Sequence, residues 1–172
     1  MPSASVIELS RGNAGIYHVP HIPDETFETA NRLLQANHNN YHVFFNDRGF
    51  HNHITHYLLT QTAIAAKPSQ MERAFAQEQR LQRPGQPADE GVIKQLDDPE
   101  FFKSCLSQEK HYTNFLFFFE RKIAKHGVGP VLREYLFSST PLAELLFSRL
   151  FASKLLSSEL SLYCSRTEGF RG

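Results

Sequence analysis

The residues with the clearest chemical potential are three histidines within six positions, His51, His53 and His56. Two more, His38 and His42, precede them, so five of the nine histidines lie between positions 38 and 56. Neutral imidazole is the commonest side-chain ligand of metal ions and transfers protons readily near neutral pH. The segment is therefore a candidate metal or acid–base site.

The elements around these histidines decide which of them can meet. Turn-forming residues 46–49 precede the cluster and an apolar stripe over 58–64 follows it, so the pattern predicts a helix that the histidines open. Residues three apart share one helix face, whereas residues two apart point about 160° from each other. His53 and His56 are therefore the preferred metal ligands, and His51 ranks second.

The remaining histidines and aromatic residues have more ordinary interpretations. His38 and His42 are four apart and, if their segment is helical, could add a second pair to a nitrogen-rich set that iron or zinc accepts. Taken singly, each is more often a capping or hydrogen-bonding residue. The phenylalanine-rich run 115–119 could line a pocket for a flat aromatic ligand, although core packing is its usual role. No Ser-His-Asp triad, phosphate-binding glycine loop or paired-cysteine motif is present, so an ordinary hydrolase or nucleotide-binding function is not indicated.

The rest of the chain has helical periodicity nearly throughout, which predicts an all-α, multi-helix globular domain. Asp98, Pro99 and Glu100 have the residue types of an N-cap and first helical turn, and Gly127 suits the position after a helix end. Helices are expected over 24–37, from the histidine run to about 66, over 112–125 and over 128–136. Three more are expected to start at Pro68, Pro99 and Pro141. The clearest loop is 83–87.

The composition limits the classes of partner that are expected. The charges of eighteen basic and eighteen acidic residues cancel, which argues against binding to nucleic acid or to anionic membranes and favours a small or neutral ligand. No stretch approaches the roughly 18 apolar residues of a membrane span. The two widely separated cysteines are typical of free thiols in a reducing compartment, and the N-terminus has no evident signal peptide, so a cytoplasmic location is expected.

An ordered series of motifs, including the histidine run, resembles the questin oxidase-like family of fungal polyketide enzymes. The matching blocks are Leu33-Leu34-Gln35, Asn37-His38, Phe44-Phe45-Asn46, the run Gly49 to Leu59, Gln82-Arg83-Pro84, Asp98 to Phe102, Tyr112 with Phe115-Leu116 and Phe118-Phe119, Glu134 to Phe137, and Arg149 to Ala152.

The resemblance implies an oxidoreductase that performs a Baeyer–Villiger-like, NADPH-linked oxygenation and ring opening of an anthraquinone-type polyketide. Neither the family nor this chain has an obvious flavin-binding fingerprint, so histidine-bound non-haem Fe(II) is a sensible oxygen activator. By position, His53 and His56 are the first candidates for its ligands and His51 the next. No residue can be assigned to NADPH.

The resemblance also divides the chain. It covers about residues 20–152, which leaves 1–19 as a flexible lead-in and 153–172 as a divergent tail. Family chains are much longer, so we expect the N-terminal portion of a larger helical enzyme, with a tail that arises from an altered reading frame, a retained intron or a premature end. Two alternatives stay open: a non-catalytic helical binding or scaffold protein, and a small complete metalloenzyme that uses only the histidines present.

Overall fold

The computed structural model describes residues 5–151, and the tail expected over 153–172 lies outside them. The α-helices of the described part are α1 (Asp24–Asn40), α2 (Ile54–Ala63), α3 (Pro68–Glu78), α4 (Glu90–Gln95), α5 (Pro99–Cys105), α6 (Tyr112–His126), α7 (Val128–Tyr135) and α8 (Pro141–Phe151). Three short 3-10 helices, η1 (Arg11–Asn13), η2 (Gln79–Leu81) and η3 (Glu109–His111), accompany them. Over this range β-structure is limited to two isolated bridges, so the all-α prediction is confirmed. None of the helices described has both the length and the apolar character needed to cross a membrane.

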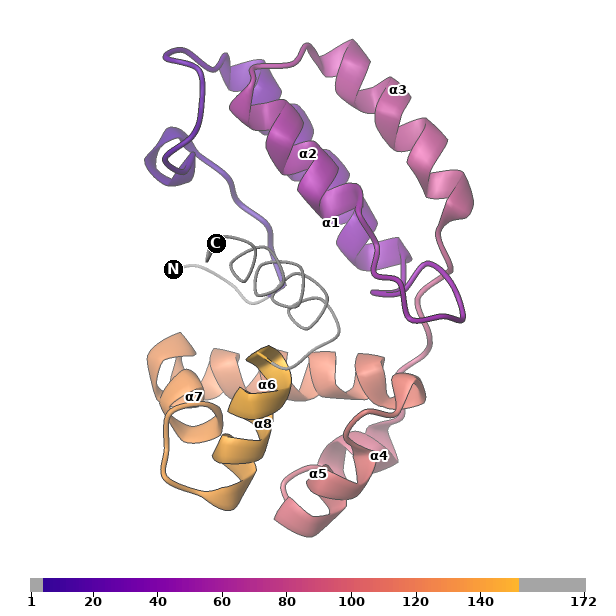
Figure 1. Ribbon diagram of the computed structural model, residues 1–172, viewed down its shortest axis with the longest axis vertical. Coiled ribbons are helices and arrows are strands. Elements are labelled where there is room, and N and C mark those ends of the chain that lie inside the picture. Colours follow the sequence, from indigo (N-terminus) through magenta and orange to yellow (C-terminus); the bar gives the residue numbers. More distant parts are fainter. Residues whose placement is uncertain (1–4, 152–172) are drawn as a thin grey trace, which may run out of the picture.

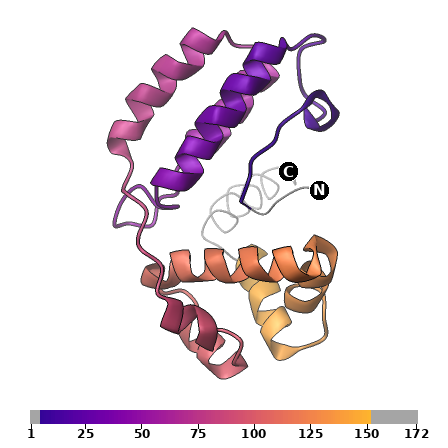
Figure 2. The same ribbon diagram turned by 180° about the vertical axis from the view of Figure 1, so that it is seen from behind.

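The helices form two lobes (Figure 1). Helices α1–α3 make the upper lobe and α4–α8 the lower one, and the view from behind shows the same division (Figure 2). Each lobe has its own cluster of buried apolar side chains. The space between the lobes is therefore bounded by two separately packed walls.

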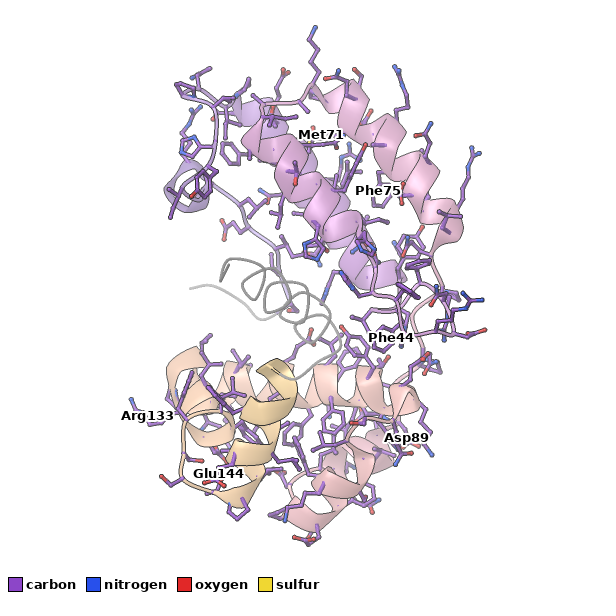
Figure 3. The ribbon with its side chains drawn as sticks, in the orientation of Figure 1. Phe44, Met71, Phe75, Asp89, Arg133 and Glu144 are labelled. Atoms are coloured by element: carbon purple, nitrogen blue, oxygen red, sulfur yellow. The ribbon has the colours of Figure 1, made fainter. Side chains whose placement is uncertain are left out.

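The N-terminal lobe packs α1 against α2 and α3. Leu33 and Leu34 of α1 meet Ile54 and Leu58 of α2, and all four are at most 4% exposed. Met71 extends from α3 toward the same core and is fully buried (Figure 3). Each such side chain contributes roughly 1.5–3 kcal/mol by leaving water. This core fixes α1, whose last turn reaches the space between the lobes.

The C-terminal lobe is built around Phe102. Asp98 accepts a hydrogen bond from the Phe101 backbone N–H and caps α5, with Pro99 in the first turn as expected. Phe102 is 1% exposed. Its ring lies 4.8–6.2 Å from those of Phe115, Phe118, Phe119 and Tyr135. Most of the phenylalanine-rich run is therefore core, and it anchors α6 beneath the space between the lobes.

Part of the segment expected as a flexible lead-in is hydrogen-bonded to α1. Gln35 accepts from the Ile7 backbone N–H at 2.9 Å, and Asn31 binds both the N–H and the C=O of Leu9 at 2.6 and 3.0 Å. Ile7 and Leu9 also pack against the N-terminal core. The side-chain amides of Asn31 and Gln35 thus provide hydrogen-bond partners for the backbone of this segment, which has no neighbouring strand in the described part of the chain to supply them.

Helix boundaries differ from the expectation most at the histidine cluster. His53 is the N-cap of α2 and His56 lies in its first turn, but His51 precedes the helix, which begins at Ile54, whose backbone N–H donates to the Asn52 side chain. Helix α4 was not expected; Asp89 caps it, but its six residues are too few to show a helical period. Gly127 ends α6 at φ 83°, a conformation that favours glycine, as its position after the helix predicted.

Candidate active site between the two lobes

A tight hairpin joins α1 to α2 and carries the histidine cluster. Phe44 and His51 form an antiparallel bridge, and the Phe45 backbone N–H donates to the C=O of Phe50 at 2.9 Å. At the tip, the Asn46 side chain accepts from the backbone N–H groups of Arg48 and Phe50 at 3.0 and 3.2 Å. The hairpin therefore fixes His51 beside the start of α2.

The three histidines of the cluster do come together, but not in the predicted arrangement. The ring of His51 stacks on that of His53 at 4.2 Å and meets His56 edge-on at 5.3 Å, whereas His53 and His56 are 6.1 Å apart. The expected angle of about 160° between His51 and His53 held only for a regular helix that contains both residues. The helical angle did not apply, because His51 and His53 both precede the first residue of α2.

This arrangement does not make a complete metal site. Imidazole lone pairs lie in the ring plane, so two stacked rings do not aim them at one point about 2 Å from both nitrogens. Within residues 5–151, no three His, Cys, Asp or Glu side chains are grouped so that they could hold a metal ion. Burial first, and then the nearby His53 and His56, lower the pKa of His51, which favours neutral imidazole. The Fe(II) assignment of His53, His56 and His51 stays a prediction.

A cavity of about 870 Å³ lies between the lobes, next to the cluster. Its volume is in the range of sites for drug-sized molecules. Its walls are the C-terminal end of α1, residues 41–43, residues 84–88 and one face of α6. Asn52 and Thr55 line it, but His51, His53 and His56 do not. The polar and ionisable side chains that line it are Ser5, Asn37, His38, Asn39, Asn40, Tyr41, His42, Asn52, Thr55, Gln86, Tyr112, Thr113 and Glu120.

A chain of hydrogen bonds organises the wall nearest to the cluster. Asn52 donates to Asn37 at 2.8 Å, and Asn37 donates to the Thr55 hydroxyl at 3.4 Å. Asn37 is 8% exposed, and a polar group this buried needs hydrogen-bond partners, which Asn52 and Thr55 provide. This network ties the end of α1 to the start of α2.

An imidazole–carboxylate contact spans the cavity. His38 on α1 places Nε2 3.6 Å from Oε1 of Glu120 on α6, and both side chains are largely shielded from water. Glu120 lies eight residues after Tyr112, on the same face of α6. The pair brings an imidazole of the upper lobe and a carboxylate of the lower lobe together in the cavity lining.

His42 is the most buried polar residue of the cavity wall. It follows the end of α1 instead of continuing it, so the predicted helical pair with His38 is not formed. The imidazole is 1% exposed, and its Nδ1 accepts from the Phe44 backbone N–H at 3.0 Å. Its Nε2 is buried with no hydrogen-bond partner among the residues described, a situation that typically costs about 1–3 kcal/mol.

Tyr112 faces His42 from the first residue of α6. The two rings meet edge-on at 5.2 Å. Burial, and then the negative charge of Glu120, raise the pKa of the Tyr112 phenol, so it keeps its proton at neutral pH. The cavity therefore holds a neutral phenol beside a buried imidazole.

Arg83 joins the lobes at the edge of the site. Its guanidinium lies 2.5 Å from Glu109 in η3, donates to the Asn46 C=O at 3.1 Å and lies 3.3 Å from Asp47. The Arg83 backbone C=O also accepts from the His42 N–H at 2.9 Å. One residue thus contacts the hairpin, His42 and η3 of the lower lobe together.

Sequence reasoning missed most of this cavity. His38 and His42 ranked below the denser cluster, and Tyr112 entered only as part of a motif. Glu120 carried a usable signal, because a carboxylate four residues after Leu116 on a mostly apolar helix face is unusual for a buried segment. The sequence did not show that α6 lies opposite the end of α1.

Comparison with known proteins agrees with the resemblance. The family model described as Questin oxidase-like matches residues 50–157, more than half of the chain. A questin oxidase of Aspergillus terreus is 42% identical over 151 residues, which cover 88% of this chain and 34% of that protein. The Baeyer–Villiger oxidase ptaJ of Pestalotiopsis fici is 40% identical over 149 residues, which cover 87% of this chain and 34% of that protein. The Baeyer–Villiger oxidase AgnL3 of Paecilomyces divaricatus is 37% identical over 151 residues, which cover 88% of this chain and 33% of that protein.

The chain spans about a third of the length of these curated relatives. The matched part includes the histidine cluster, the linker with Arg83 and all of α6. The expected relationship is confirmed: the chain belongs to the Questin oxidase-like family.

Proposed function

We propose that this chain forms a substrate-contacting part of a fungal oxidase that carries out a Baeyer–Villiger oxygenation of an anthraquinone-type polyketide. The supporting observation is the cavity between the lobes, whose walls combine aromatic rings with His38, His42 and Glu120. Relatives over this part of the chain are named questin oxidase and Baeyer–Villiger oxidase.

The reaction proposed inserts one oxygen atom of dioxygen into the carbon–carbon bond next to a carbonyl group. The second oxygen atom leaves as water, and NADPH with one proton supplies the two electrons. Hydrolysis of the resulting ester opens the ring.

The cavity suits the substrate side of this reaction. Leu116 and Phe117 on α6 and Leu34 on α1 provide apolar walls for a flat ring system. Such a surface removes water from the reacting carbonyl, and the polar groups at the ends of the cavity can orient its oxygen atoms. Phe117 remains 39% exposed, so a bound ring would cover apolar surface that now faces water.

Two variants test the location of the substrate. Leu116→Trp fills the cavity, whereas Leu132→Trp makes the same change on α7, at a side chain that is 43% exposed and lies outside it. Binding of a trihydroxyanthraquinone to the purified chain is followed by fluorescence titration. We expect Leu116→Trp to weaken binding at least about tenfold, a loss of roughly 1.4 kcal/mol, and Leu132→Trp to leave it unchanged.

Activity is tested with the same ligand, NADPH and isotope-labelled dioxygen, with mass spectrometry of the product. One labelled oxygen atom in the product supports the oxidase function for this chain. Saturable binding without incorporation shows that the chain holds the substrate site but does not oxygenate by itself, which both a part of the oxidase and the binding-protein alternative predict. Absence of binding, or equal binding by the two tryptophan variants, contradicts the proposed site.

A further inference from the structure

His42 carries a hydrogen-bonding group that the protein leaves unused. Three buried side-chain atoms lack a hydrogen-bond partner within the described residues: Nε2 of His42 and the Oε1 atoms of Gln61 and Gln82. Of these three residues, only His42 lines the cavity between the lobes. Buried polar atoms are nearly always paired in proteins, and an exception commonly marks a site for water or a ligand.

The neighbouring hydrogen bond defines what this group can bind. Nδ1 accepts from the Phe44 backbone N–H, so a neutral imidazole carries its proton on Nε2. The unpaired atom is therefore a donor that needs an acceptor. The amides of the same cavity wall do not supply one, because the Asn37 oxygen accepts from Asn52 and the Asn52 oxygen accepts from the Ile54 backbone N–H.

The surroundings of the imidazole favour an aromatic ligand. His42 lies between the rings of Tyr112, at 5.2 Å, and Phe44, at 5.7 Å. Phe44 is at the seam between the lobes (Figure 3) and does not line the cavity, whereas Tyr112 does. Because Nε2 is buried, a ligand atom reaches it only when a neighbouring side chain shifts, and Tyr112 is the ring neighbour of His42 that also lines the cavity.

We infer that His42 recognises the substrate by donating a hydrogen bond from Nε2 to a carbonyl or phenol oxygen of a flat aromatic ligand in this cavity. This role depends on the proposed function, since it assumes an oxygen-bearing aromatic substrate there. The hydrogen bond selects for that oxygen and sets the orientation of the ring. When the acceptor is the reacting carbonyl, the donor also withdraws electron density and makes the carbonyl carbon easier to attack.

Two soluble probes isolate the hydrogen bond: anthraquinone-2-sulfonate, which has carbonyl oxygens, and anthracene-2-sulfonate, which has the same rings without them. Their dissociation constants are measured by titration calorimetry with the wild-type chain, His42→Asn and His42→Gln. The Asn side chain can still accept from the Phe44 N–H but has no donor at the Nε2 position. The longer Gln side chain can present an amide N–H close to that position.

We expect the wild-type chain to prefer the quinone probe at least about tenfold, as a site with an unpaired donor should. His42→Asn loses this preference, and His42→Gln restores part of it. In the wild-type chain, long-range proton–nitrogen NMR correlations should show the Nε2–H tautomer and a shift of Nε2 with the quinone probe alone. The NMR measurement does not depend on the folding of either variant.

The outcomes separate this inference from the proposed function. If both probes bind equally, or if His42→Asn keeps the preference, the role of His42 is refuted while the cavity stands as the aromatic site. An Nε2 resonance that does not respond to the quinone probe refutes it as well. If neither probe binds, both the inference and the proposed substrate site are wrong.

Discussion

Of the three contacts that the Arg83 guanidinium makes, we expect one to contribute most of the free energy that holds the two lobes together. Its guanidinium reaches Glu109, the Asn46 C=O and Asp47. The Arg83 and Glu109 side chains are 27% and 33% exposed, whereas Asp47 is 99% exposed. Water and salt screen an exposed charge strongly, so the shorter and more buried contact with Glu109 should dominate.

The expected magnitudes follow from that difference. A half-buried, charge-assisted pair at 2.5 Å lies between exposed pairs, worth up to about 1 kcal/mol, and buried charged hydrogen bonds, worth about 1.5–3 kcal/mol. We therefore expect a coupling energy of about 1–1.5 kcal/mol between Arg83 and Glu109. Arg83→Met should cost about 2 kcal/mol, because it also removes the donor to the Asn46 C=O. Asp47→Asn should have no measurable effect.

The assay is urea unfolding of the wild-type chain, Arg83→Met, Glu109→Gln and the double variant, with Asp47→Asn as the matched control. The double-mutant cycle gives the coupling energy directly. High salt should reduce it only modestly. A coupling energy near zero, or an effect of Asp47→Asn as large as that of Glu109→Gln, would refute this account of how the lobes are joined.

Two further changes test the core and the pH dependence. Phe102→Ala removes a ring that is 1% exposed and should cost about 3–5 kcal/mol in urea unfolding, whereas Phe117→Ala, at 39% exposure, should cost far less; similar losses would contradict the assigned core. Burial and then Lys110 lower the pKa of His111, against an opposing effect of Asp89. The unfolded chain therefore takes up this proton first, and the free energy of unfolding should fall as the pH drops through about 6.5. His111→Gln should lose less stability than the wild type between neutral and mildly acidic pH, and parallel curves would argue against the shift.

Much of the fold could be predicted because its signals are local. Asp98 and Pro99 specify the start of α5, and Gly127 specifies the end of α6, through caps and backbone conformations that involve only neighbouring residues. The apolar period of α1 and α6 likewise depends on one helix at a time. These features need no knowledge of what lies opposite each helix.

The site was harder to predict because it depends on contacts between distant segments. The stacking of His51 on His53 requires the bridge between Phe44 and His51, and nothing in the helical period encodes that hairpin. One of the two rings that pack against His42 belongs to Tyr112, seventy residues later in the chain. Local patterns therefore identified the density of histidines but not the ones that line the cavity.

Hydrogen bonds within the hairpin between α1 and α2 connect the histidine cluster to the wall of the cavity. The Phe44 backbone N–H donates to His42, and Phe44 is also the bridge partner of His51. Asn52, between His51 and His53, donates its backbone N–H to the Val43 C=O. A loop this short, closed by its own hydrogen bonds, has little internal freedom to absorb a displacement. We therefore expect a displacement of the cluster to shift the cavity wall, and thermodynamic linkage then requires that a ligand which shifts the wall changes the free energy of that displacement by the same amount.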